Sequence, residues 1–226
     1  MKLNQLAKLT GILLLIQLVA GIYVNFSLIP LLGTSLDALT PQLVTAISGL
    51  SVISIVGLSA INLIIIIINF DTFARQLPKL YLSALSISII AVTLTSVEAA
   101  QLSEFTSLIS AWVESSNHQP TQLDLQFRQL LSEGRNEAHY LAIEISSISL
   151  LFFYAMLHLG TAIPRPLVSF ALLACSLQII AIGFSFFEAS IPVLLQLPLF
   201  ITQIILPFYL VFRGFGLRPA ASPVNA

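Results

Sequence analysis

Charged residues are scarce in this sequence. Asp, Glu, Lys and Arg make up 8% of its 226 residues, whereas 57% are hydrophobic, and the formal net charge is -1. A soluble domain carries charge on about a quarter of its residues, because its surface must be hydrated. The composition therefore excludes an ordinary soluble domain and indicates a protein embedded in lipid.

Cysteine, histidine and catalytic patterns are also scarce or missing. The single cysteine, Cys175, permits no intrachain disulfide and no thiolate metal cluster. The three histidines form no Glu-x-x-His pair, and neither G-x-S-x-G nor H-E-x-x-H occurs. No basic tract is interleaved with aromatic residues, which argues against nucleic-acid binding. We therefore predict no catalytic residue and no metal ligand, disfavour an enzyme, and find no pattern that identifies a cofactor.

Six long apolar stretches fill most of the chain. They lie near residues 10–32, 43–70, 80–102, 138–160, 167–188 and 191–212. A bilayer core of about 30 Å is crossed by about 20 helical residues, and helices satisfy every backbone group inside hydrocarbon. The sequence predicts an all-α fold in which residues 1–226 form one transmembrane domain, a six-helix transmembrane bundle.

The placement of lysine and arginine predicts the orientation of the bundle. With six spans, seven of these residues fall on one side and only Arg128 and Arg135 on the other. The seven are Lys2, Lys8, Arg75, Lys79, Arg165, Arg213 and Arg218. Because cytoplasmic loops carry the excess of positive charge, we expect both termini in the cytoplasm.

The longest connection, residues 103–137, is predicted to contain one short amphipathic external helix between spans three and four. Leu123, Phe127 and Leu130 share a face at helical spacing. Thr121 and Asp124 form a plausible capping box, and Gly134 is expected to end the helix. Such a helix fits either a lid over a cavity or a solvated connector that hides its apolar face, and the connector is favoured.

Three spans each carry a seam, a row of residues spaced by three and four, in which polar side chains are frequent. The second span has Ser48, Ser51, Ile55, Leu58, Asn62, Ile65 and Asn69; the fourth has Glu137, Tyr140, Glu144, Ser147, Leu151, Tyr154 and His158; the fifth has Ala171, Ala174, Gln178, Ala181, Ser185 and Glu188. Polar groups are costly against lipid, so these seams are expected to face one another.

Depth along the spans singles out Glu98, Glu144, Glu188 and His139. At 1.5 Å per residue all four fall in the outer half of the membrane. We predict that they converge, with Tyr140 and Gln178, on an outward-facing ligand-binding pocket. Alternatives stay open: each acid hydrogen-bonds a neighbour and only fixes helix register, the cluster exchanges protons as in transporters, or it holds a metal.

Prolines interrupt the sixth span. Pro198 and Pro207 each remove an intrahelical hydrogen bond, so this helix is expected to bend or break. Broken helices line substrate sites in transporters, although proline kinks are also ordinary packing devices. The two halves of the chain show no inverted repeat, which weakens the transporter interpretation.

Short motifs spread along nearly the whole chain resemble a family of bacterial multi-pass proteins. They are Leu9-Thr-Gly-Ile-Leu-Leu-Leu-Ile, Leu-Pro-Lys-Leu at 77–80, Val97-Glu98-Ala99, Ile163-Pro-Arg-Pro-Leu167 and Tyr209-Leu-Val-Phe-Arg-Gly-Phe215. The chain is in these features similar to domain-of-unknown-function family 4386, although Thr95 stands where that family has an arginine. The resemblance implies six helices in a bacterial inner membrane and supplies no activity.

Taken together, these patterns predict a multi-pass protein of the cell membrane that contacts membrane lipids and binds a small or amphiphilic ligand from the outer side. One alternative is an accessory or scaffold subunit, for which a membrane protein partner or a second copy would cover the apolar helix faces. A second alternative is a proton-coupled transporter. The sequence does not identify the ligand.

Overall fold

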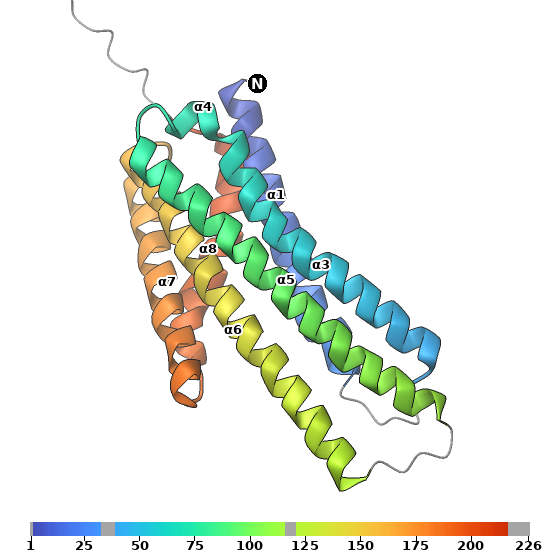
Figure 1. The fold of residues 1–226 in the computed structure, drawn as a ribbon. Helices are drawn as coiled ribbons and strands as arrows, with labels where there is room; N and C mark the ends of the chain where they lie inside the picture. Colours follow the sequence, from blue (N-terminus) through green and yellow to red (C-terminus); the bar gives the residue numbers. More distant parts are fainter. Residues whose placement is uncertain (1, 33–38, 116–120, 217–226) are drawn as a thin grey trace, which may run out of the picture. The chain divides into compact units, whose positions relative to one another are not determined.

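The computed structural model describes residues 2–32, 39–115 and 121–216, which are helical apart from short connections and contain no strand. Figure 1 shows the helices in chain order. They are α1 (Leu3–Tyr23), the π-helix η1 (Val24–Leu28), α2 (Ile29–Leu31), α3 (Pro41–Ile68), α4 (Phe70–Phe73), α5 (Pro78–Glu114), α6 (Gln122–Leu159), α7 (Arg165–Gly183), the 3-10 helix η3 (Phe184–Phe187) and α8 (Val193–Arg213).

Six helical segments in the described part of the chain are long and apolar enough to cross a membrane. They are Leu3–Leu31, Pro41–Ile68, Pro78–Glu114, Gln122–Leu159, Arg165–Phe187 and Val193–Arg213. Each overlaps one apolar stretch of the sequence, so the prediction of six membrane-spanning helices in an all-α protein is confirmed at this level. The six spans support a multi-pass membrane protein.

The chain divides into two compact units, and four helices contribute to both. Unit 1 consists of Met1–Leu15, Ile64–Ser86 and Ser147–Ala226, and unit 2 of Ile16–Leu63 and Ile87–Ser146. The break points fall inside α1, α3, α5 and α6, whereas α7 and α8 lie entirely within unit 1.

The segment before the fourth span is not a separate short helix. Residues from Gln122 onward form one continuous helix of 38 residues, α6. The capping box at its start is confirmed: the Thr121 amide and hydroxyl donate to Asp124 Oδ2 at 2.8 and 2.7 Å, and the Asp124 amide donates to Thr121 Oγ1 at 3.2 Å. The prediction that Gly134 ends a helix is wrong, because Gly134 does not adopt a positive φ and the helix continues through it.

Unit 1 is built around small residues of α7 and a continuous α8. Ala171, Ala174 and Ala181 are fully buried where α7 packs with α8. Pro198 and Pro207 both lie inside α8, which is one helix, so of the expected bend or break the break is contradicted. A proline removes a single intrahelical hydrogen bond, which the packing of a buried face can outweigh.

Unit 2 has an apolar core where η1, α2 and Leu32, which continue α1, meet α3 and α5. This continuation, residues 24–32, is called the end of α1 from here on. The buried members of the core are Val24, Leu28, Leu32, Leu39, Val44, Ile47, Ile55, Leu102 and Ile109. The end of α1 is irregular because Pro30 has no amide to donate. A π-turn forms here, in which the Ile29 amide donates to the Val24 carbonyl. The helical segment ends at Leu32, whose amide donates to the Ile29 and Pro30 carbonyls. This end of α1 forms one wall of the candidate site.

Candidate functional site

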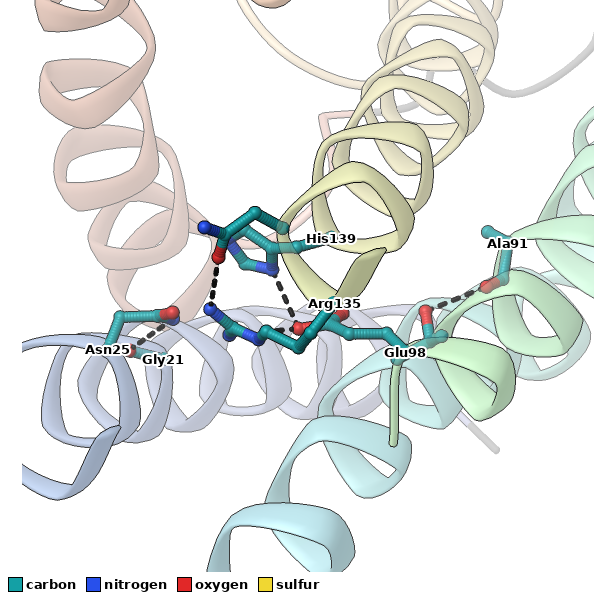
Figure 2. Close-up of polar contacts among 8 residues, drawn as sticks. Gly21, Asn25, Ala91, Glu98, Arg135 and His139 are labelled. Carbon is teal, nitrogen blue, oxygen red and sulfur yellow. Dashed lines mark hydrogen bonds and ion pairs between the residues drawn. The ribbon is translucent and has the colours of Figure 1, made fainter. Parts of the chain in front are cut away.

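Glu98 on α5 is the most buried acidic side chain among the described residues, and it meets two basic side chains of α6. Its Oε1 accepts a hydrogen bond from Arg135 Nη2 at 3.2 Å and lies 2.7 Å from His139 Nδ1 (Figure 2). The Glu98 side chain is 4% exposed and that of Arg135 12%. The carboxylate is therefore held in a charge-neutralising cluster within unit 2.

Helical spacing on both sides produces this cluster. Arg135 and His139 are four residues apart, so they share one face of α6. Glu98 shares the buried face of α5 with Thr95 and Leu102. A carboxylate is buried at low cost only when it is paired, and removing one partner of such a pair leaves an uncompensated charge. The cluster accordingly fixes the register of α5 against α6.

A cavity of about 590 Å³ lies beside the cluster, entirely within unit 2. One wall is apolar and is formed by the end of α1, by α5 and by one residue of α6. Its residues are Ile29, Pro30, Leu32, Leu102, Phe105 and Leu125. The volume falls in the range of about 300–1,000 Å³ that is usual for small-molecule sites.

The remaining lining residues are polar, all come from α6 and form what is here called the polar wall. Its residues are Arg128, Gln129, Ser132, Glu133, Arg135 and Asn136. Arg135 joins the Glu98 cluster to this wall, because its Nη1 donates to Asn136 Oδ1 at 3.1 Å while its Nη2 holds Glu98. The Nε of Arg135 is buried and has no hydrogen-bond partner in the structure. The cavity thus has an amphiphilic lining with two guanidinium groups.

The second guanidinium, that of Arg128, contacts the end of α1. Its Nη2 donates to the Leu32 carbonyl at 3.4 Å. Carbonyl groups at a helix C-terminus lack intrahelical partners and carry partial negative charge, which attracts a cation. This long bond uses one of the five N–H donors of the side chain. In the described ranges Arg128 makes no ion pair with a carboxylate.

The residues predicted from the sequence fall in different places. Glu98 and His139 are in contact, and Tyr140 lies beside His139 with ring centroids 5.9 Å apart. Glu144 is half-buried in α6, and its Oε2 is buried without a hydrogen-bond partner. None of Glu98, His139, Tyr140 and Glu144 lines the cavity described above.

The other two predicted residues belong to unit 1. Gln178 is buried on α7. Glu188 is exposed, just past the 3-10 turn η3, with a left-handed φ of 57°. Glu98 and Glu144 lie in unit 2 and Glu188 in unit 1, so the convergence of the three carboxylates stays a prediction. Among the residues that the structure describes, no three His, Cys, Asp or Glu side chains gather as a metal site would require.

Sequence reasoning missed the basic stripe of α6. Arg128, Ser132, Arg135 and His139 are spaced by four, three and four residues, which places them on one helix face. In the sequence the two arginines stand out only as positive charges that bear on the orientation of the spans. Steps of four and three taken upstream from His139 would have found the stripe, although not its partner Glu98.

Comparison of this chain with family models, with curated proteins and with solved structures finds no match.

Proposed function

We propose that this multi-pass membrane protein binds an amphiphilic ligand in the cavity of unit 2, on the outer side of the membrane. The observation that carries the proposal is the cavity's division into an apolar wall and a polar wall with two arginines. Ligand sites typically combine a mainly apolar lining with a few convergent polar groups that fix orientation.

Glu98 has a positioning role in this proposal. Its carboxylate holds Arg135 at 3.2 Å, with His139 on the same oxygen, so the guanidinium stays at the cavity wall. A long side chain that is already ordered loses less conformational entropy when a ligand binds. In this proposal Glu98, one of the acids that the sequence singled out, positions Arg135 from outside the cavity, and Arg128 and Arg135 face the ligand.

Filling the cavity tests the proposal without changing any charge. Ser132 is half-buried on the polar wall, and Ser132→Phe places an aromatic ring in the cavity. The matched control is Ser103→Phe, because Ser103 is exposed on α5, also in unit 2, and is not a lining residue. Mass spectrometry after purification in mild detergent measures retained lipid or other amphiphile. We expect retention by the wild type and the control and at least a fivefold loss in Ser132→Phe, of the order expected when bound contacts are replaced by a clash.

The proposal fails if Ser132→Phe folds, as judged by a single size-exclusion peak, and retains the same molecules in the same amount as the wild type. Loss in both variants would point instead to general destabilisation of unit 2 and would equally contradict a specific role for the cavity.

A scaffold or accessory subunit is the second candidate, and one observation favours it. Leu123, Phe127 and Leu130 form an exposed apolar stripe on the first part of α6, with exposures of 72%, 53% and 62%. The same stretch of helix carries Asp124, Arg128 and Glu133, which are costly in hydrocarbon. Co-purification of a stoichiometric membrane protein that is lost in Leu123→Ser/Phe127→Ser would support this alternative.

A further inference from the structure

We infer that the head group of the ligand is an anion, a carboxylate or a phosphate, bound by Arg128 and Arg135 while its hydrocarbon chain lies against the apolar wall. This inference rests on the proposed binding function and adds the chemical class of the ligand. It follows from the charges at the polar wall, from the unused donors there and from the position of the apolar residues.

Of the two arginines at the polar wall, only Arg135 is paired with a carboxylate among the described residues. Arg135 is neutralised by Glu98 at 3.2 Å. Glu133 is exposed, and its Oε1 already accepts a hydrogen bond from Gln129 Nε2 at 2.7 Å. Arg128 is half-buried and has no carboxylate partner in the described ranges, so its positive charge remains available to a ligand.

Unused donors point to an acceptor ligand. The Arg135 Nε–H is buried with no hydrogen-bond partner, which is unfavourable, but it has almost no accessible surface and does not itself face the cavity. Arg128 spends one N–H on a long 3.4 Å bond to the Leu32 carbonyl. A guanidinium pairs best with planar or tetrahedral oxyanions, which accept two parallel hydrogen bonds. A neutral hydroxyl head group would offer a single acceptor oxygen and no charge.

The apolar wall supplies the site for the hydrocarbon chain. Pro30, Leu102 and Phe105 line the same cavity as the arginines and offer no hydrogen-bonding side chain. An inorganic anion would leave this surface in contact with water, whereas an alkyl chain would bury it. The two walls together therefore favour an anion that carries a hydrocarbon chain over an inorganic anion and over an uncharged hydrocarbon.

A matched pair of fluorescent probes tests the charge of the head group. The probes are cis-parinaric acid and its methyl ester, which share one tail and differ in charge at a pH well above the pKa of the acid. Each is titrated into delipidated protein in a nonionic detergent. We expect the acid to bind about tenfold more tightly than the ester, the scale of one charge-assisted hydrogen-bonded pair. Equal affinity of acid and ester would overturn the inference while leaving the proposed binding function standing.

Arginine variants locate the charge preference. Arg128→Gln is expected to reduce the preference for the acid to less than about threefold with little effect on the ester, since it removes one cation and retains the side-chain length. Arg75→Gln is the control, because this substitution removes the same charge from an exposed position in unit 1. Arg135→Lys keeps the charge beside Glu98 and is expected to retain part of the preference.

An unchanged preference in Arg128→Gln would overturn the inference. Failure of both probes to bind, with Ser132→Phe also without effect, would remove the proposed function itself.

Competition identifies the source of the anion. Displacement of the bound acid by phosphatidylglycerol and not by phosphatidylcholine supports an anionic lipid of the bilayer. Displacement by palmitate and not by phosphatidylglycerol supports a free single-chain acid. Displacement by inorganic phosphate at the same concentration as the lipids would show that no tail is needed and would overturn the inference.

Discussion

At the scale of single residues, the buried carboxylate of Glu98 is the most consequential group in unit 2. It is 3% exposed and serves two basic partners through one oxygen. Attraction between buried charges does not by itself stabilise a fold, because both charges must first be desolvated. Once they are buried, however, removing one partner destabilises the fold, because the other charge stays buried without compensation.

Glu98→Gln is expected to destabilise the protein by about 3 kcal/mol, because it keeps the side-chain shape and leaves the Arg135 guanidinium buried without an anion. Thermal unfolding in detergent, followed by the fluorescence of the single tryptophan Trp112, measures the change. Glu104→Gln is the control, since Glu104 is exposed on the same helix, where a charge contributes little to stability. In Glu98→Gln/Arg135→Gln we expect part of the loss to be recovered. Equal shifts for Glu98→Gln and Glu104→Gln would contradict the buried pair.

Sequence reasoning reached part of this cluster. The cost of charge in hydrocarbon singled out Glu98, and depth along the spans grouped it with His139, which the structure places 2.7 Å away. Arg135 was missed because a charge count treats a loop arginine as a topological signal. Glu188 lies on the surface because the chain leaves the helix at a left-handed residue, a local turn that periodicity cannot anticipate.

At the scale of helices, α1 and α8 of unit 1 approach each other so closely at Gly11 that a side chain does not fit between them. A Cβ atom on Gly11 would lie 2.7 Å from the Pro207 carbonyl oxygen and 2.9 Å from Val211 Cγ2. The contact with Pro207 is to the backbone and cannot yield by a rotamer change. Glycine is therefore required at this crossing for space.

Gly11→Ala is expected to lower the free energy of unfolding by about 1–3 kcal/mol, because the two helices must move apart. Gly57→Ala is the matched change, since Gly57 lies inside α3 with nothing within 4 Å of the position of its Cβ. There we expect a gain of up to about 1 kcal/mol from helix propensity alone. Thermal unfolding of the two variants in one detergent compares them, and a shift of the same sign in both would show that Gly11 is not a packing residue.

Helix lengths show where hydropathy stops being informative. The third and fourth apolar stretches were predicted at residues 80–102 and 138–160, whereas α5 and α6 have 37 and 38 residues. A hydropathy pattern reports the part of a helix that is compatible with lipid, which needs about 20 residues. Continuation beyond it depends on capping at Thr121 and on packing around Glu98, and the second of these is a property of the folded unit.

At the scale of the whole molecule, the apolar runs were enough to predict the number and approximate place of the spans. Each of the six predicted stretches overlaps one candidate span. The cavity could not be predicted in the same way, because it requires knowledge of which faces of α1, α5 and α6 meet. The residues that line it are ordinary in type, and their role follows from contacts between segments about a hundred positions apart, such as Leu32 and Arg128.

The orientation of the chain decides which compartment supplies the ligand, and the positive-inside pattern predicts the outer one. Single cysteines placed in a Cys175→Ala background test this, at Gln129 beside the cavity and at Gln76 between α4 and α5, because both positions are exposed. A membrane-impermeant maleimide is expected to label Gln129→Cys in intact cells and Gln76→Cys only after permeabilisation, because Arg75 and Lys79 flank Gln76 and such residues are retained on the cytoplasmic side. The reverse pattern would place the cavity in the cytoplasm and make a cytoplasmic anion its ligand. Labelling of both positions from outside would contradict the six-span topology, because the single span between them, Pro78–Glu114, must place them on opposite sides of the membrane.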